Sequence, residues 1–481
     1  MFNTKLMVLL CSSFCVQSLY SADHKKNVLF IGVDDLRPAL GCYGNDQVKS
    51  PAIDQFASRS VVFTRAYCQY PVCNPSRRSV LSGLRPQRFG YSKLLSEVAP
   101  DHITMPGYFK QNGYYTASIG KMYHGKNEDF ASWTYCDEAG LWQNYGNPDN
   151  YKKKPMPALE YENLPDTAYP DGQVTQIAIK KLRENKGGPF FIGVGYRKPH
   201  LPFAAPKKYW DLYDLHKIKI PDDTSAPEGC AEYVYKWSEM FAYTPTAFAF
   251  APTWQNDDDL TKVPIDTNTL QELTHGYYAC VSFIDAQINL LLTELKREGL
   301  DKNTVVVLWA DHGWNLGEQH IIGKHTCYEF SCRVPLIILD PGNPNNGKTC
   351  SSFVELIDLF PTLSELCGLP APPAYDGQSL APFLKDVKLS TKEYAYTSYR
   401  PHAKSVKTML GTSLRSGQFR FTEWRDLETN EIKGKELYEI KNKENEKVNL
   451  VNQAKYSDLV SKYSGIVNDS IVSWHLYPLK K

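Results

Sequence analysis

Three short runs of residues along the chain are continuously apolar rather than alternating. They are residues 27–33 (NVLFIGV), 189–195 (PFFIGVG) and 304–310 (TVVVLWA). Each run is rich in β-branched or aromatic residues, and polar residues follow it closely, as is typical of strands buried on both faces. The three runs therefore predict central strands of one sheet.

Two further segments, 175–184 and 270–297, have apolar residues at intervals of three and four, which predicts helices. Strands that alternate with helices favour an α/β fold with a largely parallel sheet. Segments 135–170 and 243–268 are rich in Pro, Tyr, Asn and Asp, and we expect them to be loops that wall a ligand site.

The composition turns polar near residues 386–392, which predicts a boundary between a larger domain, 23–385, and a smaller C-terminal domain, 386–481. The charged run 441–447 is expected to be a solvated turn. Residues 1–22 have a basic start and an apolar stretch too short to span a bilayer, which predicts a cleaved signal peptide.

A signal peptide implies a secreted or periplasmic protein, with a lipid anchor on Cys11 or Cys15 as an alternative. The 481 residues, 42% of them hydrophobic, can bury a sizeable core. The net charge of +1 gives the whole chain no electrostatic footprint for nucleic acid or a membrane surface, so we expect neither nucleic-acid binding nor membrane insertion. The twelve cysteines show no zinc-site spacing, and some are expected to pair in an oxidising compartment.

Polar side chains follow all three predicted strands. They are Asp34 and Asp35 after the first, Lys198 and His200 after the second, and Asp311 and His312 after the third. The carboxyl ends of parallel strands form the ligand-binding edge of such a sheet, so these segments are expected to meet at one site. Carboxylates suit calcium or magnesium, although an Asp pair after a strand is also a common helix cap.

The stretch 71–86, PVCNPSRRSVLSGLRP, places Cys73 close to Arg77 and Arg78. A thiol among such charges could be a nucleophile with a lowered pKa, but sulfur is a poor partner for a hard cation. The segment resembles the CxPSR signature of the type I sulfatase family, in which the cysteine is oxidised to formylglycine. The hydrated aldehyde then supplies an oxygen nucleophile, which suits a hard metal ion.

The resemblance extends, in the family's order, over residues 27 to about 385. It rests on NVLFIGVDDLRPALGCYGN, CNPSRRSVLSGLRP, GYFKQNGYYTASIGKMYHG, PFFIGVGYRKPHLPF and DHGWNLGEQHIIGKHT. It implies an alkaline-phosphatase/sulfatase-like α/β fold with a large, mostly parallel central sheet flanked by helices. A smaller C-terminal α+β domain would carry a short antiparallel sheet.

The same resemblance implies roles for individual residues. One calcium ion, or alternatively magnesium, would be bound by Asp34, Asp35, Cys73, Asp311 and His312. The catalytic residues would be Cys73 as formylglycine, Arg77 as its clamp, Lys121, His124, His200 and Lys324. Of these, Lys121, His200 and Lys324 would bind the sulfate, His200 and Lys324 would protonate the leaving sugar oxygen, and His124 would deprotonate the sulfated diol. His320 is expected to be a surface residue.

We therefore predict a sulfatase that acts on a sulfated polysaccharide or oligosaccharide and is matured by a formylglycine-generating enzyme. DDLRPALGCYG, GYRKPHLPF and His312 resemble the members that remove the 2-O-sulfate of iduronic acid in glycosaminoglycans. Lys407 and Arg415 are candidates to bind the uronate carboxylate. Two alternatives stay open: a phosphonate or phosphodiester hydrolase of the same superfamily, and a non-catalytic protein that binds sulfated glycans through an unmodified Cys73.

Overall fold

The computed structural model describes residues 25–89, 102–125, 129–137, 144–248, 257–440 and 446–473. The predicted signal peptide, with Cys11 and Cys15, lies outside them. The ten cysteines in the described residues are all free, so the expected disulfides are absent from this part of the chain. Within the same residues, none of the helices combines the length and the apolar character that a membrane span requires.

The central sheet has eight strands, and its order brings together segments from the whole larger domain. The order is β14 (Thr349–Glu355), β2 (Val61–Tyr67), β13 (Arg333–Leu339), β10 (Thr304–Ala310), β1 (Asn27–Val33), β7 (Phe190–Tyr196), β3 (Tyr115–Gly120) and β4 (Tyr135–Asp137). Strand β13 is antiparallel to both of its neighbours, and the other neighbouring pairs are parallel. The prediction of a mostly parallel sheet is confirmed.

The three strands predicted from apolar runs are neighbours in the order β10, β1, β7. Val33 pairs with both Ala310 and Tyr196, so the three strands end side by side. Every residue of the three strands is buried, as their continuous apolar character predicts. The polar residues that follow them therefore meet at one edge of the sheet.

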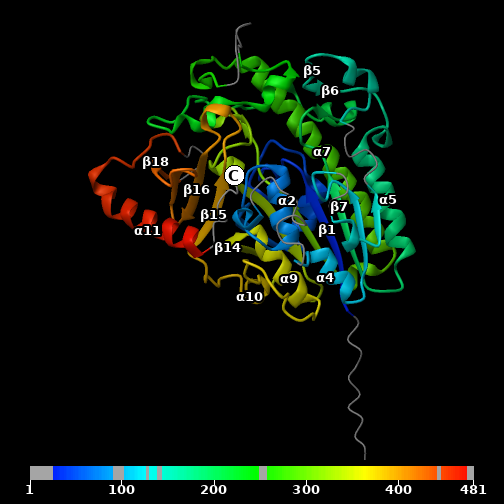
Figure 1. Ribbon diagram of the computed structural model, residues 1–481. Coiled ribbons are helices and arrows are strands. Elements are labelled where there is room, and N and C mark those ends of the chain that lie inside the picture. Colours follow the sequence, from blue (N-terminus) through cyan, green and yellow to red (C-terminus); the bar gives the residue numbers. More distant parts are fainter. Residues whose placement is uncertain are drawn as a thin grey trace, which may run out of the picture.

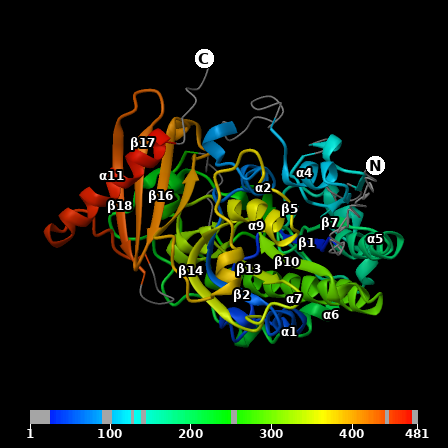
Figure 2. The same cartoon turned by 90° about the horizontal axis from the view of Figure 1, so that it is seen from below.

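Helices cover both faces of this sheet (Figure 2). One layer contains α1 (Pro51–Ala57), α5 (Pro170–Glu184), α6 (Lys207–Trp210) and α7 (Thr267–Arg297), and the other contains α2 (Cys73–Ser82), α4 (Met105–Gln111), α9 (Leu359–Leu366) and α10 (Ala381–Lys385). Asp266 caps the start of helix α7, because its side chain accepts a hydrogen bond from the Thr269 N–H (2.7 Å). Helix α5 begins at Pro170, before the predicted start, because its first turn has proline rather than an apolar stripe.

The segments predicted to be loops contain short paired strands as well as irregular chain. The pairs are β5 (Met156–Pro157) with β9 (Tyr243–Thr244), and β6 (Leu159–Glu160) with β8 (Phe203–Ala204). A third pair, β11 (Asn315–Leu316) with β12 (Ile322–Gly323), follows β10. The first pair joins the two predicted loops, and the second ties the first loop to the segment that follows β7.

A smaller antiparallel sheet lies beside the central one and carries the C-terminal helix (Figure 1). It consists of β15 (Tyr394–Tyr399), β16 (Met409–Ser416), β17 (Phe419–Asp426) and β18 (Ile432–Glu439), with α11 (Ser457–Ser473) packed on it. Its core joins strand residues Leu414 and Phe421 to Tyr463 and Val467 of the helix. The predicted domain boundary near 386–392 falls between α10 and β15.

A buried charge network attaches this sheet to the larger domain at α8 (Glu329–Cys332). Arg415 and Arg420 donate to Glu329 at 3.2 and 2.5 Å, and Arg420 also pairs with Glu446 at 2.9 Å. Two predictions are therefore corrected. Arg415 is 5% exposed and has a protein carboxylate as its partner, which argues against contact with a uronate. Glu446 is buried rather than solvated, while residues 441–445 lie outside the described chain.

Asp285 on α7 makes the stability of the fold depend on pH. Its carboxylate accepts hydrogen bonds from the N–H groups of Ile53 (2.7 Å) and Ala52 (3.2 Å), yet burial raises its pKa to about 6. A carboxyl whose pKa is raised on folding stabilises the protein fully below its unfolded pKa of about 4, and this contribution is lost as pH rises through about 6. Between pH 5 and pH 7 the loss is about 1 kcal/mol.

We therefore expect the melting temperature of the unaltered protein minus that of Asp285→Asn to be larger at pH 5 than at pH 7. Scanning calorimetry of both proteins at the two pH values measures this difference. An identical difference at both pH values would show that Asp285 is ionised in the folded protein throughout this range.

Candidate active site

The residues predicted to bind a metal converge at the carboxyl ends of β1 and β10 and the first turn of α2. Their possible ligand atoms form two overlapping groups, each with all atoms within 4.8 Å of one another. The groups are Asp34, Asp35, Cys73 and His200, and Asp34, Cys73, Asp311 and His312. The structure thus brings all five predicted ligands together and adds His200.

The backbone of Asp35 is held in an uncommon conformation. Its φ of 61° lies in the left-handed region, which costs a non-glycine residue about 1–2 kcal/mol. The conformation is fixed by two hydrogen bonds: the Asp35 N–H donates to Asp311 Oδ1 (3.2 Å), and the Tyr277 hydroxyl donates to the Asp35 carbonyl (2.8 Å). The fold therefore maintains strain at the point where β1 enters the site.

Arg77 lies one turn after Cys73 on α2 and pairs with two of the carboxylates. Its Nε donates to Asp311 Oδ2 (2.7 Å), its Nη2 donates to Asp34 Oδ1 (3.3 Å), and its Nη1 donates to the Lys121 carbonyl. The guanidinium is fully buried, and these carboxylates raise its pKa against the opposing effect of burial. Arg77 is thus a permanent cation that fixes the carboxylates in place.

Two lysines contact the carboxylates from the other side. Lys121 Nζ donates to Asp34, and Lys324 Nζ donates to both oxygens of Asp35 at 2.8 and 3.0 Å. Lys121 follows β3, where Gly195 of β7 allows its backbone to approach closely, since a Cβ at that glycine would lie 2.0 Å from the Lys121 carbonyl oxygen. Burial would raise the pKa of Asp34, but Lys121 and Arg77 hold it well below its usual range.

Cys73 lies between these groups, 98% buried. Its Sγ is 3.3 Å from His312 Nε2, 3.4 Å from Lys324 Nζ and 3.9 Å from Asp35 Oδ1. Burial and Asp34 would raise the pKa of the thiol, but Lys121, Lys324 and His312 together lower it. An oxygen in place of this sulfur would face the same cations.

The donor set fits a hard divalent cation. Three carboxylates with no exposed surface supply oxygen ligands. His312 Nδ1 donates to the carbonyl of Gly313 (3.1 Å), which orients the ring and leaves Nε2 facing the cluster. Because the sulfur of Cys73 is the one soft donor, an oxygen at residue 73 would complete a set suited to calcium or magnesium.

Two histidines predicted to take part in catalysis lie at the same edge. His200 is buried, its Nδ1 donates to the Leu201 carbonyl (2.5 Å), and burial together with Lys324 holds its pKa well below 6.5. His124 is mostly buried, and burial together with Lys121 lowers its pKa to about 4. Both rings are therefore neutral at pH 7 in this arrangement, which suits His124 to accept a proton.

The loop that carries His200 is held by two buried polar residues. Asp171 accepts hydrogen bonds from the backbone N–H groups of Arg197 (2.7 Å) and Lys198 (2.9 Å). Lys198 Nζ donates to the carbonyls of Pro202 (2.6 Å) and His200 (3.1 Å). Lys198, which follows the second predicted strand, thus positions the loop and does not join the cluster.

The sequence analysis missed one member of the site, Glu239. Its Oε1 lies 3.5 Å from His200 Nε2 and its Oε2 lies 3.4 Å from Lys324 Nζ. It belongs to an irregular segment, 229–242, that has no periodic pattern and no quoted family motif, so no signal pointed to it. Glu239 brings a fourth carboxylate to the cluster.

Two other residues singled out in the sequence, Lys407 and His320, lie outside the cluster. Lys407 is exposed in the segment between β15 and β16, where its carbonyl accepts a hydrogen bond from Arg400 (2.9 Å). His320 is not at the surface as predicted: it is 8% exposed, and its ring nitrogens lie 3.0 Å from the carbonyls of Thr224, Leu260 and Val263. The polar surroundings of this histidine are backbone groups, which a residue pattern does not reveal.

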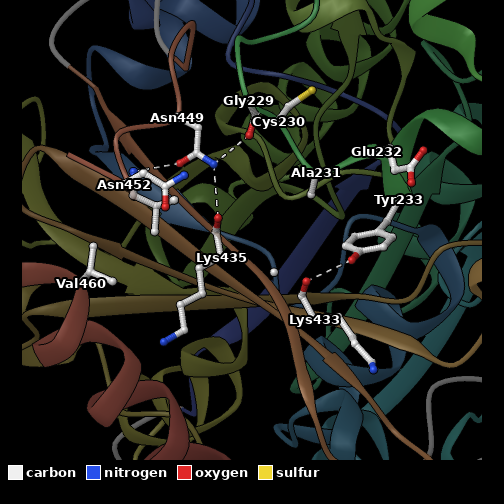
Figure 3. Close-up of a pocket in the computed structure, with 12 residues that line it drawn as sticks. Gly229, Cys230, Ala231, Glu232, Tyr233, Lys433, Lys435, Asn449, Asn452 and Val460 are labelled. Carbon is white, nitrogen blue, oxygen red and sulfur yellow. Dashed lines mark hydrogen bonds between the residues drawn. The ribbon is translucent and has the colours of Figure 1, made fainter. Parts of the chain in front are cut away.

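A separate pocket of about 490 Å³ lies between residues 229–233 and strand β18 (Figure 3). Asn449 crosses it, donating from Nδ2 to the carbonyls of Gly229 (2.9 Å) and Lys435 (3.2 Å), and the Tyr233 hydroxyl donates to the Lys433 carbonyl (3.4 Å). Its polar groups join residues 229–233 to the smaller sheet, and the pocket contains none of the clustered residues.

Comparisons with known proteins agree with this geometry. The sulfatase family model matches residues 26–369, and the model of the N-sulphoglucosamine sulphohydrolase C-terminal region matches residues 317–471. Iduronate 2-sulfatases of Mus musculus and Homo sapiens are each 30% identical over 94% of this chain and 96% of their own. A solved structure described as a 2-O GAG sulfatase has a TM-score of 0.69 at 22% identity, covering 94% of this chain and 93% of its own. The phosphonate monoester hydrolase of Silicibacter pomeroyi shares the fold, with a TM-score of 0.75 at 22% identity over 95% of this chain and 97% of its own.

Proposed function

Because the chain belongs to the sulfatase family and is a sulfuric ester hydrolase, we propose that it removes the 2-O-sulfate of iduronic acid-type uronates in glycosaminoglycan-like glycans. The observation that carries the proposal is the position of Cys73, which lies at the start of α2 within 3.4 Å of both His312 Nε2 and Lys324 Nζ. The names of the two mammalian relatives support the choice of sugar.

The proposal includes oxidation of Cys73 to formylglycine by a maturation enzyme, and one calcium ion. Asp34, Asp35, Asp311, His312 and residue 73 would hold the ion, with magnesium as the alternative. When bound, the ion supplies Lewis-acid stabilisation of charge on oxygen, and hydrated formylglycine supplies the oxygen nucleophile. We further propose that the protein is secreted or periplasmic, as its N-terminal sequence predicts.

The remaining steps belong to side chains of this protein. Lys121, Lys324 and His200 bind the sulfate oxygens, where fixed positive charge and hydrogen-bond donors stabilise the transition state. As the oxygen of residue 73 bonds to sulfur, the bond between sulfur and the sugar oxygen breaks, and its electron pair leaves with the sugar oxygen, which takes a proton from Lys324 or His200. The negative charge of the bound sulfate ester favours the protonated form of His200, which is neutral without substrate. His124 accepts the proton of the second hydroxyl of residue 73, and that oxygen forms the C=O bond of the aldehyde as the carbon–oxygen bond to the sulfate breaks and sulfate leaves.

Disaccharides sulfated at defined positions test this function. We expect release of sulfate from the 2-O-sulfated uronate at a higher kcat/KM than from a 6-O-sulfated neutral sugar, and we expect chelation of calcium to stop it. Faster hydrolysis of an aryl phosphonate than of an aryl sulfate would instead indicate the phosphonate hydrolase. Binding of sulfated glycan without turnover, with residue 73 a thiol, would indicate the binding protein.

Lys407 remains our candidate for the uronate carboxylate. We expect Lys407→Ala to raise KM for the sulfated uronate about tenfold and to leave KM for the sulfated neutral sugar unchanged, because one charged hydrogen bond contributes about 1.4 kcal/mol. Steady-state kinetics on both substrates measures the two constants, with Lys404→Ala, a nearby exposed lysine, as the control. Equal increases in KM on both substrates would exclude the assignment.

A further inference from the structure

Glu239 contacts both side chains that the proposed function places at the leaving oxygen. Its two carboxylate oxygens contact different partners: Oε1 lies 3.5 Å from His200 Nε2, and Oε2 lies 3.4 Å from Lys324 Nζ. Its side chain is 16% exposed, while those of Lys324 and His200 are 3% and 9% exposed. One carboxylate therefore links a residue that follows β7 to a residue that follows β12.

The segment that carries Glu239 is itself fixed by aromatic rings. Trp237 stacks on His402, with ring centroids 5.0 Å apart and planes 22° apart. His325, which follows Lys324, meets Trp237 edge to face at 4.6 Å and His402 at 4.8 Å. The rings thus hold the chain on both sides of the contact between Glu239 and Lys324.

This arrangement also involves the C-terminal domain. His402 lies between β15 and β16 of the smaller sheet, whereas Trp237 and His325 belong to the larger domain. Ser238 adds a local constraint, because its Oγ accepts a hydrogen bond from the Met240 N–H (3.2 Å) as the next turn begins. Glu239 is therefore placed by contacts from three separate parts of the chain.

Asp35 competes with Glu239 for the ammonium group of Lys324. Lys324 Nζ donates to both oxygens of Asp35 and forms an ion pair with Glu239, so the lysine lies between the carboxylates proposed to bind the metal and Glu239. A carboxylate on the far side draws the ammonium toward His200 and fixes the separation of the two groups. Without Glu239, attraction to Asp35 and the contact with Cys73 Sγ (3.4 Å) would decide where Lys324 lies.

We propose that Glu239 is a positioning residue, which sets the separation of His200 and Lys324 at the leaving oxygen and is itself seated by the stack of Trp237 on His402. The proposal rests on the proposed function and extends it to Glu239, Trp237 and His402, which are not among the residues proposed to hold the ion. It assigns the C-terminal domain a part in the site, through His402.

The dependence of rate on the leaving group tests the proposal. A sugar oxygen must be protonated as it leaves, whereas the nitrophenolate of 4-nitrophenyl sulfate is a stable anion that needs little protonation. For Glu239→Gln we expect kcat on a 2-O-sulfated uronate disaccharide to fall about 100-fold, with a fall of about threefold or less on 4-nitrophenyl sulfate. KM is expected to change little on either substrate, because Lys121, which pairs with Asp34 rather than Glu239, still binds the sulfate.

Controls separate this result from general damage. Glu232→Gln alters an exposed glutamate of the same segment, which pairs with Lys236, and should leave both rates unchanged. His402→Ala should lower kcat on the disaccharide relative to kcat on 4-nitrophenyl sulfate, as Glu239→Gln does, but by a smaller factor. In the double variant the two effects should not be additive.

Equal losses of kcat on both substrates in Glu239→Gln, with an unchanged melting temperature, would overturn the positioning role. Additive effects of the two substitutions would overturn the part assigned to His402. If the unaltered enzyme hydrolyses neither substrate, the proposed function itself fails. This outcome is distinguishable because it is seen without any substitution at Glu239.

Discussion

Replacing Cys73 by alanine is expected to lower kcat for sulfate esters on the order of 10⁴-fold or more, because the nucleophile is lost. The melting temperature should change little, since the substitution removes a single buried sulfur and leaves the surrounding ion pairs in place. Activity on an aryl sulfate and calorimetry measure the two effects. Cys350→Ala removes a buried free cysteine of β14 and should keep full activity.

Cys73→Ser extends this test to the role of the second hydroxyl. Serine keeps one hydroxyl, so it can accept the sulfate but has no second hydroxyl whose deprotonation by His124 would expel it. We expect a single turnover that leaves a sulfated serine, visible as an added sulfate by mass spectrometry of the intact protein. Continuous turnover by this variant would contradict the scheme.

Replacing Asp311 by asparagine is expected to lower kcat on the order of 10³-fold and to abolish stabilisation of the protein by calcium. Asp311 supplies a carboxylate to one of the two clusters of possible ligands and pairs with Arg77 Nε at 2.7 Å. Its removal weakens the site for a cation and leaves Arg77, which is fully buried, without its shortest ion pair. The melting temperature with calcium and with a chelator gives the direct readout.

Asp285→Asn is the matched control for this substitution. Asp285 and Asp311 are both buried, and each accepts two hydrogen bonds from backbone N–H groups, but Asp285 lies on α7 away from the cluster. We expect Asp285→Asn to keep the full increase in melting temperature on addition of calcium. An undiminished calcium response in Asp311→Asn would exclude Asp311 as a ligand.

The parts of the fold that position the site could be predicted from the sequence because they are buried on both faces. Burial on both faces produces uninterrupted apolar runs, and the runs 27–33 and 304–310 coincide with β1 and β10. Ligand sites form at the carboxyl ends of parallel strands, and the pairing of β1 with β10 brings the polar residues that follow them to one such site. The sequence therefore predicts that Asp34, Asp35, Asp311 and His312 converge.

The residues that could not be predicted owe their roles to contacts between distant parts of the chain. Glu239 lies in an irregular segment, and its partners His200 and Lys324 follow different strands. The sequence offers Arg415 as a candidate to bind the uronate carboxylate, but its carboxylate partner in the structure is Glu329, 86 residues away. A carboxylate at such a sequence distance leaves no periodic pattern, so only the folded chain identifies it.

The central claim is that residue 73, as an oxidised side chain beside a hard cation, supplies the oxygen that takes the sulfate. Mass spectrometry of the peptide that contains residue 73, on preparations of different specific activity, tests it most directly. The account predicts that the specific activity of a preparation rises in proportion to the fraction of residue 73 that is in the aldehyde form. Full activity in a preparation whose residue 73 is entirely thiol would contradict it.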